Sequence, residues 1–231
     1  MSKVAIVGAT GFTGIELLKI LKVHSKIIKI DLFSLSNPGK KINDFCPDIQ
    51  FNDTLKDFSN IVYKDYDLVF FACPNGTVMK AYSDFKDVEV KIIDLAADFR
   101  LDDENIWREY YGEKHIYPNL LSKTVYGLTE LNREKIRDAK IVANPGCYPT
   151  AAIISLFPLL KENFIKEGNI IIDAKSGYSG AGRVNLESGL EEKIKGNFIP
   201  YNIYKHRHTP EITQELNKAS DLNVKITFTP H

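Results

Sequence analysis

A short run of glycines near the N-terminus constrains the fold of this chain more than any other feature. In "VAIVGATGFTGIELLKIL", Gly8, Gly11 and Gly14 stand between a short apolar run and a helical pattern. This order predicts a strand, a tight turn and a helix, with glycines allowing the turn, the approach of a ligand and close helix packing. Because N–H groups at a helix start attract anions, we expect a dinucleotide pyrophosphate there. A glycine turn without a ligand is the alternative.

The same alternation of strand and helix continues along the chain. Continuously apolar runs separated by helical patterns predict a parallel sheet covered on both faces. These runs are "KVAIVG", "KIIKIDLFSL", "DLVFFAC", "VEVKIIDLA" and "AKIVAN". Beyond them, the sequence predicts a buried helix over 148–164, a strand over 169–177, a helix over 208–220 and a strand over 223–231. We therefore predict an α/β fold, with a doubly wound parallel sheet in residues 1–145 and an α+β substrate domain in residues 146–231.

Composition narrows the class of function. The 231 residues include 30 basic and 30 acidic side chains, so no charge excess favours a nucleic acid or a membrane surface. The longest apolar stretch, Ala151 to Leu160, is shorter than the about 20 residues of a membrane span. The apolar run before the first glycine is too short for a signal peptide. Cys46, Cys73 and Cys147 are widely spaced and lack metal-binding spacing. We expect a cytoplasmic protein without a metal that acts on a small molecule.

The end of the second predicted strand bears on the choice of cofactor. It runs into "LFSLSNPGKK", with the hydroxyls of Ser34 and Ser36 and the cations Lys40 and Lys41, whereas Asp31 lies several residues before the strand end. Hydroxyls and ammonium groups suit a 2′-phosphate, so NADP(H) is favoured over NAD; a solvated lysine pair is the alternative. The residues expected to contact the cofactor are Gly8, Thr10, Gly11, Phe12, Thr13, Gly14, Ser34, Ser36, Lys40 and Pro74.

Two cysteines compete for the role of nucleophile. Cys147, in "VANPGCYPT", begins the long helix, where backbone N–H groups stabilise a thiolate and an oxyanion. Cys73 follows an apolar strand whose end would line the cofactor groove, and Cys46 lies in the loop-like "NDFCPDIQF". Although burial is the usual fate of a cysteine, the helix start favours Cys147 as the nucleophile and leaves Cys73 as its rival.

The histidine cluster "YKHRHTPEI" offers a partner for such a thiol. His206 and His208 flank Arg207, and Glu211 follows three residues after His208 at a helix start. We predict that His208 is the general acid and base and that Glu211 orients it. The choice between the two histidines stays open, and an exposed cluster is the alternative.

A glycine-rich loop, "SGYSGAGR", follows the strand predicted after residue 168. Its hydroxyls and Arg183 can wrap a carboxylate or a phosphate, with the guanidinium as a bidentate partner. An ordinary loop without a ligand is the alternative.

Together these motifs resemble the N-acetyl-gamma-glutamyl-phosphate reductases of arginine biosynthesis. The motifs follow the family's order: "GATGFTG", "DLAADFRL", "VYGLTEL", "VANPGCYPT", "SGYSGAGR", "HRHTPEI" and "FTPH". The resemblance implies a Rossmann-type domain and an NADPH-dependent reduction of an acyl phosphate through a thioester on Cys147, with His208 and Glu211 moving protons. It also implies that Ser176, Arg183 and His206 hold the substrate's carboxylate or phosphate, and that the protein is a homo-oligomer, a dimer or a tetramer.

The chain also departs from the family pattern. Pro74, Asn75 and Gly76 stand where family members usually carry Pro-His-Gly, and Leu35 replaces a common arginine of the cofactor loop. The family continues for about another hundred residues, so we expect an incomplete second domain. Two alternatives stay open, namely a related reductase acting on an aminoadipate derivative of lysine biosynthesis and a non-catalytic dinucleotide-binding module.

Overall fold

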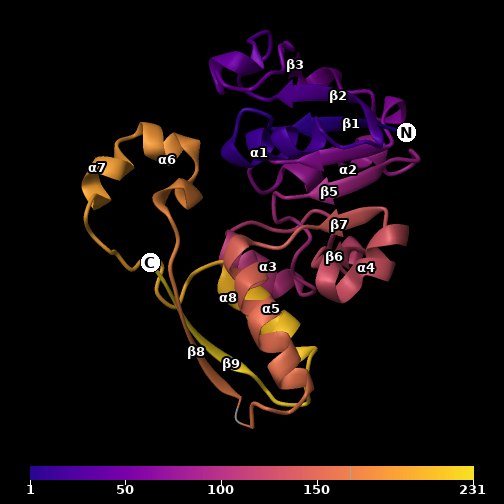
Figure 1. Cartoon of the computed structure of the whole chain (residues 1–231). Coiled ribbons are helices and arrows are strands. Elements are labelled where there is room, and N and C mark those ends of the chain that lie inside the picture. Colours follow the sequence, from indigo (N-terminus) through magenta and orange to yellow (C-terminus); the bar gives the residue numbers. More distant parts are fainter. Residues whose placement is uncertain (167) are drawn as a thin grey trace. The chain divides into compact units, whose positions relative to one another are not determined.

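The computed structural model describes residues 1–166 and 168–231 (Figure 1). Contacts between these residues divide them into two compact units. The first unit contains residues 1–99, 123–127 and 132–144, and the second contains residues 100–122, 128–131 and 145–231. Since the two units alternate along the chain between residues 100 and 145, a single boundary after residue 145 stays a prediction.

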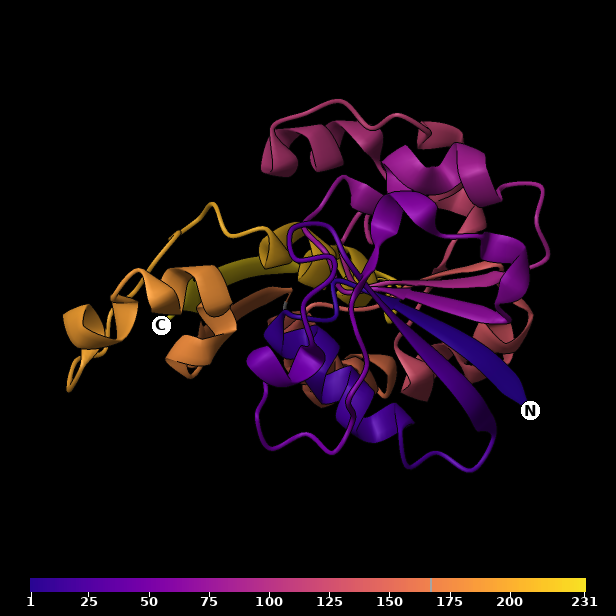
Figure 2. The same cartoon turned by 90° about the horizontal axis from the view of Figure 1, so that it is seen from above.

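The first unit is built on a parallel sheet, as predicted. Its strands are β1 (Ser2–Val7), β2 (Ile27–Ser34), β3 (Lys56–Asp57), β4 (Leu68–Phe71), β5 (Lys91–Asp94), β6 (Val125–Tyr126) and β7 (Ile141–Ala143). They lie in the order β3-β2-β1-β4-β5-β7-β6, and every neighbouring pair is parallel. Figure 2 shows them as a twisted fan. The sequence did not predict β3 and β6 because two residues are too few to carry a strand pattern.

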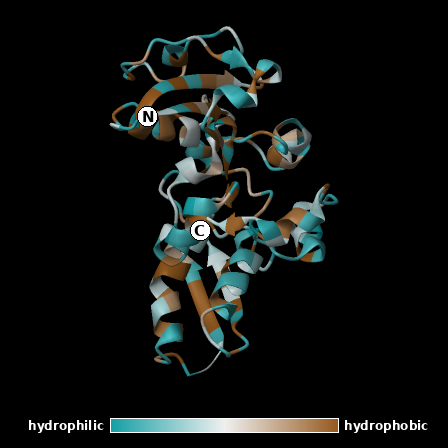
Figure 3. Ribbon diagram, turned by 90° about the vertical axis from the view of Figure 1, so that its right-hand side faces the viewer, coloured by the Kyte–Doolittle hydropathy of each residue, from teal (hydrophilic) through white to brown (hydrophobic). Residues whose placement is uncertain are grey.

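Helices cover both faces of this sheet. Ile15 and Leu18 of α1 (Phe12–Leu21) share a core cluster with Phe70 of β4. The next residue of β4, Phe71, meets Phe85 of α2 (Thr77–Phe85) with ring centroids 6.4 Å apart. Because neighbouring residues of a strand point to opposite faces, α1 and α2 lie on opposite sides of the sheet (Figure 2). The strands between them are largely hydrophobic, as their brown colour in Figure 3 shows.

The order of the strands reverses beside β1. β2 follows β1 on one side of the sheet, and β4 and β5 continue on the other. In sheets of this kind the crevice at the carboxyl ends of the two central strands is the usual ligand site. Val7 pairs with Phe71 in the register of β1 and β4, so Gly8 and Ala72 follow side by side at this edge. The glycine turn therefore stands where a dinucleotide would bind.

The second unit combines helices with a small sheet. Its main elements are α3 (Glu104–Tyr111), α5 (Cys147–Lys161), β8 (Asn169–Ala174), α6 (Arg183–Glu187), α7 (Leu190–Ile194), α8 (His208–Asn217) and β9 (Lys225–Pro230). β8 and β9 pair in parallel, with Ile172 opposite Phe228, and α5 packs against α8. The two long helices and both strands were predicted, although α5 ends at Lys161 because Asn163 adopts a positive φ of 58°.

One further helix and five short helical segments complete the secondary structure of the described residues. They are α4 (Thr129–Asp138) and the short segments Ile42–Asp44, Phe58–Asn60, Tyr63–Asp65, Pro118–Lys123 and Tyr178–Ala181. Within the part of the chain that the structure describes, no helix is both long enough and apolar enough to cross a membrane.

Candidate functional site

Two of the three glycines in the N-terminal turn are required by the fold itself. Gly8 has a φ of +83°, and a Cβ added there would lie 2.2 Å from the carbonyl oxygen of Ala72. A Cβ on Gly14 would lie 2.4 Å from the carbonyl oxygen of Gly8. Since any side chain at either position collides with backbone, these glycines permit the turn and the close packing of α1 against it.

At the third glycine, Gly11, no close backbone contact within the fold requires the absence of a side chain. A Cβ at this position would meet only the carbonyl oxygen of Gly8, at an ordinary contact distance of 3.5 Å. Gly11 is also the N-cap of α1, where it provides no side chain to the N–H groups of the first turn. A bare backbone at a helix start fits the close approach of an anion, so the turn suits the pyrophosphate of NADP.

The residues predicted to hold the 2′-phosphate all bond to one residue that the sequence analysis did not select. The Asn37 backbone N–H donates to Ser34 Oγ at 3.1 Å, and Asn37 Nδ2 donates to Ser36 Oγ at 3.0 Å. Lys40 Nζ donates to Asn37 Oδ1 at 3.0 Å. Asn37 therefore organises the loop at the carboxyl end of β2. Its position between two serines and a lysine was the signal available in the sequence.

The Asp31 carboxylate is engaged by other side chains of the first unit. Its carboxylate lies 2.9 Å from Lys56 Nζ and 3.1 Å from Lys29 Nζ, and it accepts a hydrogen bond from Tyr66 Oη at 2.8 Å. Burial alone raises the pKa of Asp31, but the hydrogen bonds from Lys56, Tyr66 and Lys29 lower it overall. The carboxylate is committed to these partners three residues before the strand ends, which agrees with the preference for NADP.

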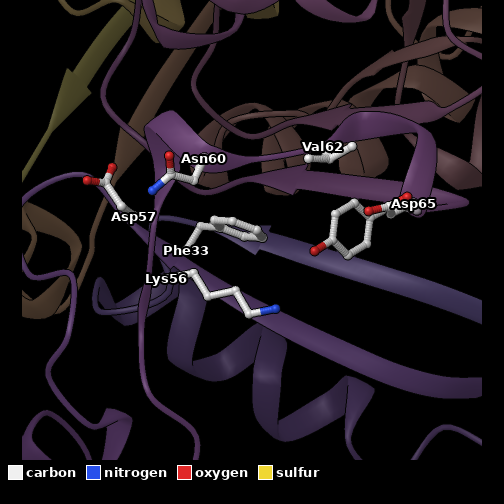
Figure 4. Close-up of a pocket in the computed structure, with 7 residues that line it drawn as sticks. Phe33, Lys56, Asp57, Asn60, Val62 and Asp65 are labelled. Atoms are coloured by element: carbon white, nitrogen blue, oxygen red, sulfur yellow. The ribbon is translucent and has the colours of Figure 1, made fainter.

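A pocket of about 400 Å³ lies beside this network at the β2–β3 edge (Figure 4). Lys56 Nζ lies 5.9 Å from the centroid of the Phe33 ring, and the rings of Phe33 and Tyr66 meet edge to face. The lining residues are Phe33, Lys56, Asp57, Asn60, Val62, Asp65 and Tyr66. None of these residues was predicted to bind the cofactor or the substrate, although Phe33 directly precedes Ser34 and Asp57 pairs with Ser34 between β2 and β3.

A buried carboxylate fixes the turn that contains Pro74. Asp98, which is fully buried, accepts hydrogen bonds from Gly76 N at 2.5 Å and from Met79 N at 2.9 Å. Gly76 has a φ of 87°, which a glycine adopts without strain. The carbonyl of Pro74 accepts from the Thr77 hydroxyl at 2.7 Å. Asp98 thus holds the start of α2 and the preceding turn at the edge where the cofactor is predicted to bind.

The three cysteines have different surroundings. Cys147 is exposed and is the first residue of α5. The Cys73 thiol donates to the carbonyl oxygen of Val7 at 3.4 Å, and burial raises the pKa of this thiol to about 12. Cys46 is partly buried against the α1 core. A thiolate is therefore strongly disfavoured at Cys73, whereas the Cys147 thiol is accessible to reagents.

The His208 ring lies directly against the residue before Cys147. A Cβ added to Gly146 would lie only 2.4 Å from His208 Nε2. His208 also contacts His206, with ring centroids 4.7 Å apart, and its backbone N–H donates to His206 Nδ1 at 3.1 Å. Burial lowers the pKa of His208 to about 3 and that of His206 to about 4. Both imidazoles are therefore neutral at neutral pH, which is the form a general base needs.

Glu211 contacts the same glycine from the other side. Its Oε1 accepts a hydrogen bond from Gly146 N at 2.9 Å, and its Oε2 lies 3.7 Å from Arg100 Nη1. His208 Nδ1 is buried without a hydrogen-bond partner among the described residues. Glu211 fixes the N-cap of α5, and its predicted role in orienting the His208 imidazole stays a prediction.

Arg100 is the residue of this cluster that the sequence analysis missed. It lies at the end of "DLAADFRL", and only 8% of it is exposed. Gln214 Nε2 donates to the carbonyl oxygen of Arg100 at 3.1 Å, which ties this segment to α8. A charged residue directly after an apolar motif was a usable signal, but its partner 111 positions later could not be read from spacing.

The remaining predicted residues lie on the loop after β8. The Ser176 N–H donates to the carbonyl oxygen of His231 at 3.0 Å. Arg183 begins α6, and its Nη1 lies 3.8 Å from Glu187 Oε1. Their roles as substrate-binding residues stay predictions. Across the described ranges, no group of three or more His, Cys, Asp or Glu side chains is placed to hold a metal ion.

Two protein-family models match the chain. Residues 3–139 match the semialdehyde dehydrogenase NAD binding domain, and residues 147–231 match the semialdehyde dehydrogenase dimerisation domain.

Relatives of known name agree with these matches. The chain is 44% identical over 234 residues to N-acetyl-gamma-glutamyl-phosphate reductase of Nitrosomonas eutropha, covering 100% of this chain and 68% of that protein. It is also 44% identical to the enzyme of that name from Pelotomaculum thermopropionicum, covering 99% of this chain and 67% of the relative. The chain thus spans about two thirds of the length of these proteins.

Solved structures show the same fold. Aspartate semialdehyde dehydrogenase II from Vibrio cholerae superposes with a TM-score of 0.71 at 16% identity, covering 100% of this chain and 70% of that one. Aspartate semialdehyde dehydrogenase with NADP from Candida albicans superposes with a TM-score of 0.59 at 15% identity. The superposition covers 100% of this chain and 67% of that one.

Proposed function

The chain belongs to the N-acetyl-gamma-glutamyl-phosphate reductases, and from this premise we propose how its residues carry out the family's reaction. The reaction is the NADPH-dependent reductive dephosphorylation of N-acetyl-L-glutamyl 5-phosphate to N-acetyl-L-glutamate 5-semialdehyde. This reaction is a step of arginine biosynthesis, and a protein that catalyses it is an oxidoreductase that acts on an acyl phosphate.

One observation supports the catalytic assignment more than any other. Gly146 receives the His208 ring on one side and donates its N–H to Glu211 on the other, and the next residue is the exposed Cys147. A nucleophile beside a neutral imidazole, at a helix start fixed by a buried carboxylate, is the arrangement that thiol catalysis requires.

We assign the chemical steps accordingly. Cys147 Sγ attacks the acyl carbon, the bond from that carbon to the phosphate oxygen breaks, and phosphate leaves with its electron pair. His208 accepts the thiol proton during this attack, and the product is a thioester. When bound, NADPH supplies the hydride that reduces this thioester. Collapse of the resulting hemithioacetal then releases the aldehyde and restores the Cys147 thiol.

Glu211 acts as a positioning residue in this scheme. By holding Gly146 N and lying beside Arg100, it fixes the start of α5 and therefore the place of the thiol. His206, whose Nδ1 is occupied by the backbone N–H of His208, is assigned to the substrate together with Ser176 and Arg183.

The cofactor residues of the first unit follow the same reasoning. The turn from Gly8 to Gly14 takes the pyrophosphate, and the loop organised by Asn37 takes the 2′-phosphate through Ser36 and Lys40. The buried Ser34 shapes this loop through its bond to the Asn37 N–H.

We also propose that the active assembly is a homo-oligomer, a dimer or a tetramer, which the match to a dimerisation domain over residues 147–231 supports. A cytoplasmic location, expected from the separated cysteines, stays a prediction.

The reverse reaction tests the function and the nucleophile together. Purified protein is mixed with N-acetylglutamate semialdehyde, phosphate and NADP, and the formation of NADPH is followed. We expect activity in the wild type, a loss of several orders of magnitude in Cys147→Ser, and near-normal rates in the matched control Cys73→Ser.

Equal rates in the wild type and Cys147→Ser would exclude the thioester route. If the protein is inactive with this semialdehyde but active with an aminoadipate-derived one, its substrate is that of the related reductase of lysine biosynthesis.

A further inference from the structure

Two tyrosines that the sequence analysis did not select lie among the candidate catalytic residues. Tyr148 directly follows Cys147, and its buried ring meets His206 and His208 edge to face, with centroids 5.7 and 5.8 Å apart. Its hydroxyl donates to the carbonyl oxygen of His231 at 3.2 Å and accepts a hydrogen bond from the Tyr201 hydroxyl at 3.1 Å. Tyr148 therefore fixes the phenol of Tyr201.

Two further contacts fix Tyr201, one through its backbone and one through its ring. Its backbone N–H donates to the carbonyl oxygen of Pro230 at 3.1 Å, and its ring meets His206 with centroids 5.5 Å apart. Nevertheless, 38% of the residue stays exposed. An aromatic side chain anchored in this way but left open to solvent presents a preformed contact surface.

The polar end of Tyr201 lies among residues already assigned to the site. Burial raises the pKa of the phenol, the hydrogen bond to Tyr148 raises it further, and a hydrogen bond with Ser176 lowers it. The Cys147 side chain adds a further, smaller increase to this pKa. The phenol is consequently a neutral hydrogen-bond donor, and it is held by the residue that follows Cys147 in the chain.

We propose, resting on the function proposed above, that Tyr201 is a substrate-binding residue whose hydroxyl donates a hydrogen bond to a phosphoryl oxygen of the acyl phosphate. The phosphate is bonded to the carbon that Cys147 attacks, so a donor within reach of the thiol is also within reach of the leaving group. A hydroxyl hydrogen rotates freely, so the Tyr201 proton can turn from Tyr148 to the phosphoryl oxygen. In the reverse direction, the same hydroxyl binds inorganic phosphate.

The test compares Tyr201→Phe with a matched control, Tyr204→Phe, in the reverse reaction. Tyr204 lies on the same segment but is 74% exposed. We expect Tyr201→Phe to raise the KM for phosphate about tenfold, which corresponds to one charge-assisted hydrogen bond. The KM for NADP should stay unchanged, and Tyr204→Phe should behave like the wild type.

A second measurement does not depend on turnover. Inorganic phosphate should protect Cys147 from alkylation by iodoacetamide in the wild type, and Tyr201→Phe should need about tenfold more phosphate for the same protection. An unchanged phosphate KM with unchanged protection overturns the proposal. An equal rise of the KM values for phosphate, semialdehyde and NADP also overturns it, since that pattern indicates a general structural role.

The two proposals fail in different ways. A wild-type protein that forms no NADPH from the semialdehyde and phosphate refutes the proposed function. An active wild type whose Tyr201→Phe variant keeps its phosphate KM refutes only the role of Tyr201.

Discussion

Substitution of Gly146 by alanine tests the packing of His208, the proposed general base, against the residue that precedes Cys147. The backbone at Gly146 has a φ of −66° and a ψ of 160°, which alanine adopts without strain. The added Cβ would lie 2.4 Å from His208 Nε2 and 2.8 Å from Cδ2 and Cε1, whereas ordinary contacts begin near 3.4 Å. The imidazole must therefore move away by about 1 Å.

A displacement of this size has a predictable kinetic cost. Misplacing a catalytic group by about 1 Å lowers the rate by about 100-fold, equivalent to about 2.7 kcal/mol of transition-state stabilisation. We expect Gly146→Ala to lose this factor in kcat/KM for the reverse reaction, while circular dichroism and the alkylation of Cys147 by iodoacetamide stay close to the wild type. His208→Asn provides the benchmark for complete loss of the base.

The matched control is Gly177→Ala. Gly177 has nearly the same backbone conformation, with a φ of −66° and a ψ of 152°, but its added Cβ would meet only Ser179 Oγ at 3.8 Å. Comparison of the two melting temperatures therefore separates the effect of a methyl group on the backbone from its effect on His208. A Gly146→Ala variant that keeps its kcat/KM within about threefold of the wild type would refute the assigned role of the His208 contact.

Three further outcomes follow from the site. Asn37→Ala removes the centre of the loop at the end of β2, and we expect the KM for NADPH to rise about tenfold with an unchanged KM for the acyl phosphate. Glu211→Gln keeps an acceptor for Gly146 N but removes a buried charge, and urea unfolding should show a loss of about 2 kcal/mol. Burial holds the pKa values of His206 and His208 at about 4 and about 3, below the about 6.5 of the unfolded chain. The unfolded state therefore binds more protons between these values. Stability should be complete above pH 6.5 and fall by up to about 2 kcal/mol per histidine at pH 5, as urea titrations at both pH values would show.

The sheet was readable from the sequence because its strands are long apolar runs. Val4, Ala5, Ile6 and Val7 are all fully buried, as a strand covered on both faces requires, and most residues of β2 and β4 are buried as well. The two-residue strands β3 and β6 follow from pairing with longer neighbours, so their own residues carry no pattern. Short strands of this kind are defined by tertiary contacts, and a short stretch of sequence does not reveal those contacts.

The residues of the candidate site also fall into those that local sequence predicted and those whose contacts only the fold reveals. Local chemistry led to the predictions for Cys147 and His208, because a helix start and a histidine cluster are properties of a few consecutive residues. The contacts of Glu211 and Arg100 depend on residues that are far apart in the sequence. The orienting role of Glu211 toward His208 stays a prediction, and no spacing rule reveals that the Glu211 carboxylate accepts from the N-cap of another helix.

Four of the glycines, Gly8, Gly11, Gly14 and Gly146, show why residue type alone did not determine function. Gly8 and Gly14 are fixed by backbone atoms of the fold, and an alanine at either position would disturb the first unit before any ligand binds. At Gly146 the limit is the ring of His208, the proposed general base, so we expect its substitution to lower activity rather than stability. At Gly11 an added Cβ would meet neither a catalytic side chain nor a backbone atom at less than 3.5 Å. The approach of the proposed cofactor to the start of α1 would explain this glycine, so we expect Gly11 to be the position in the turn most specific for the cofactor.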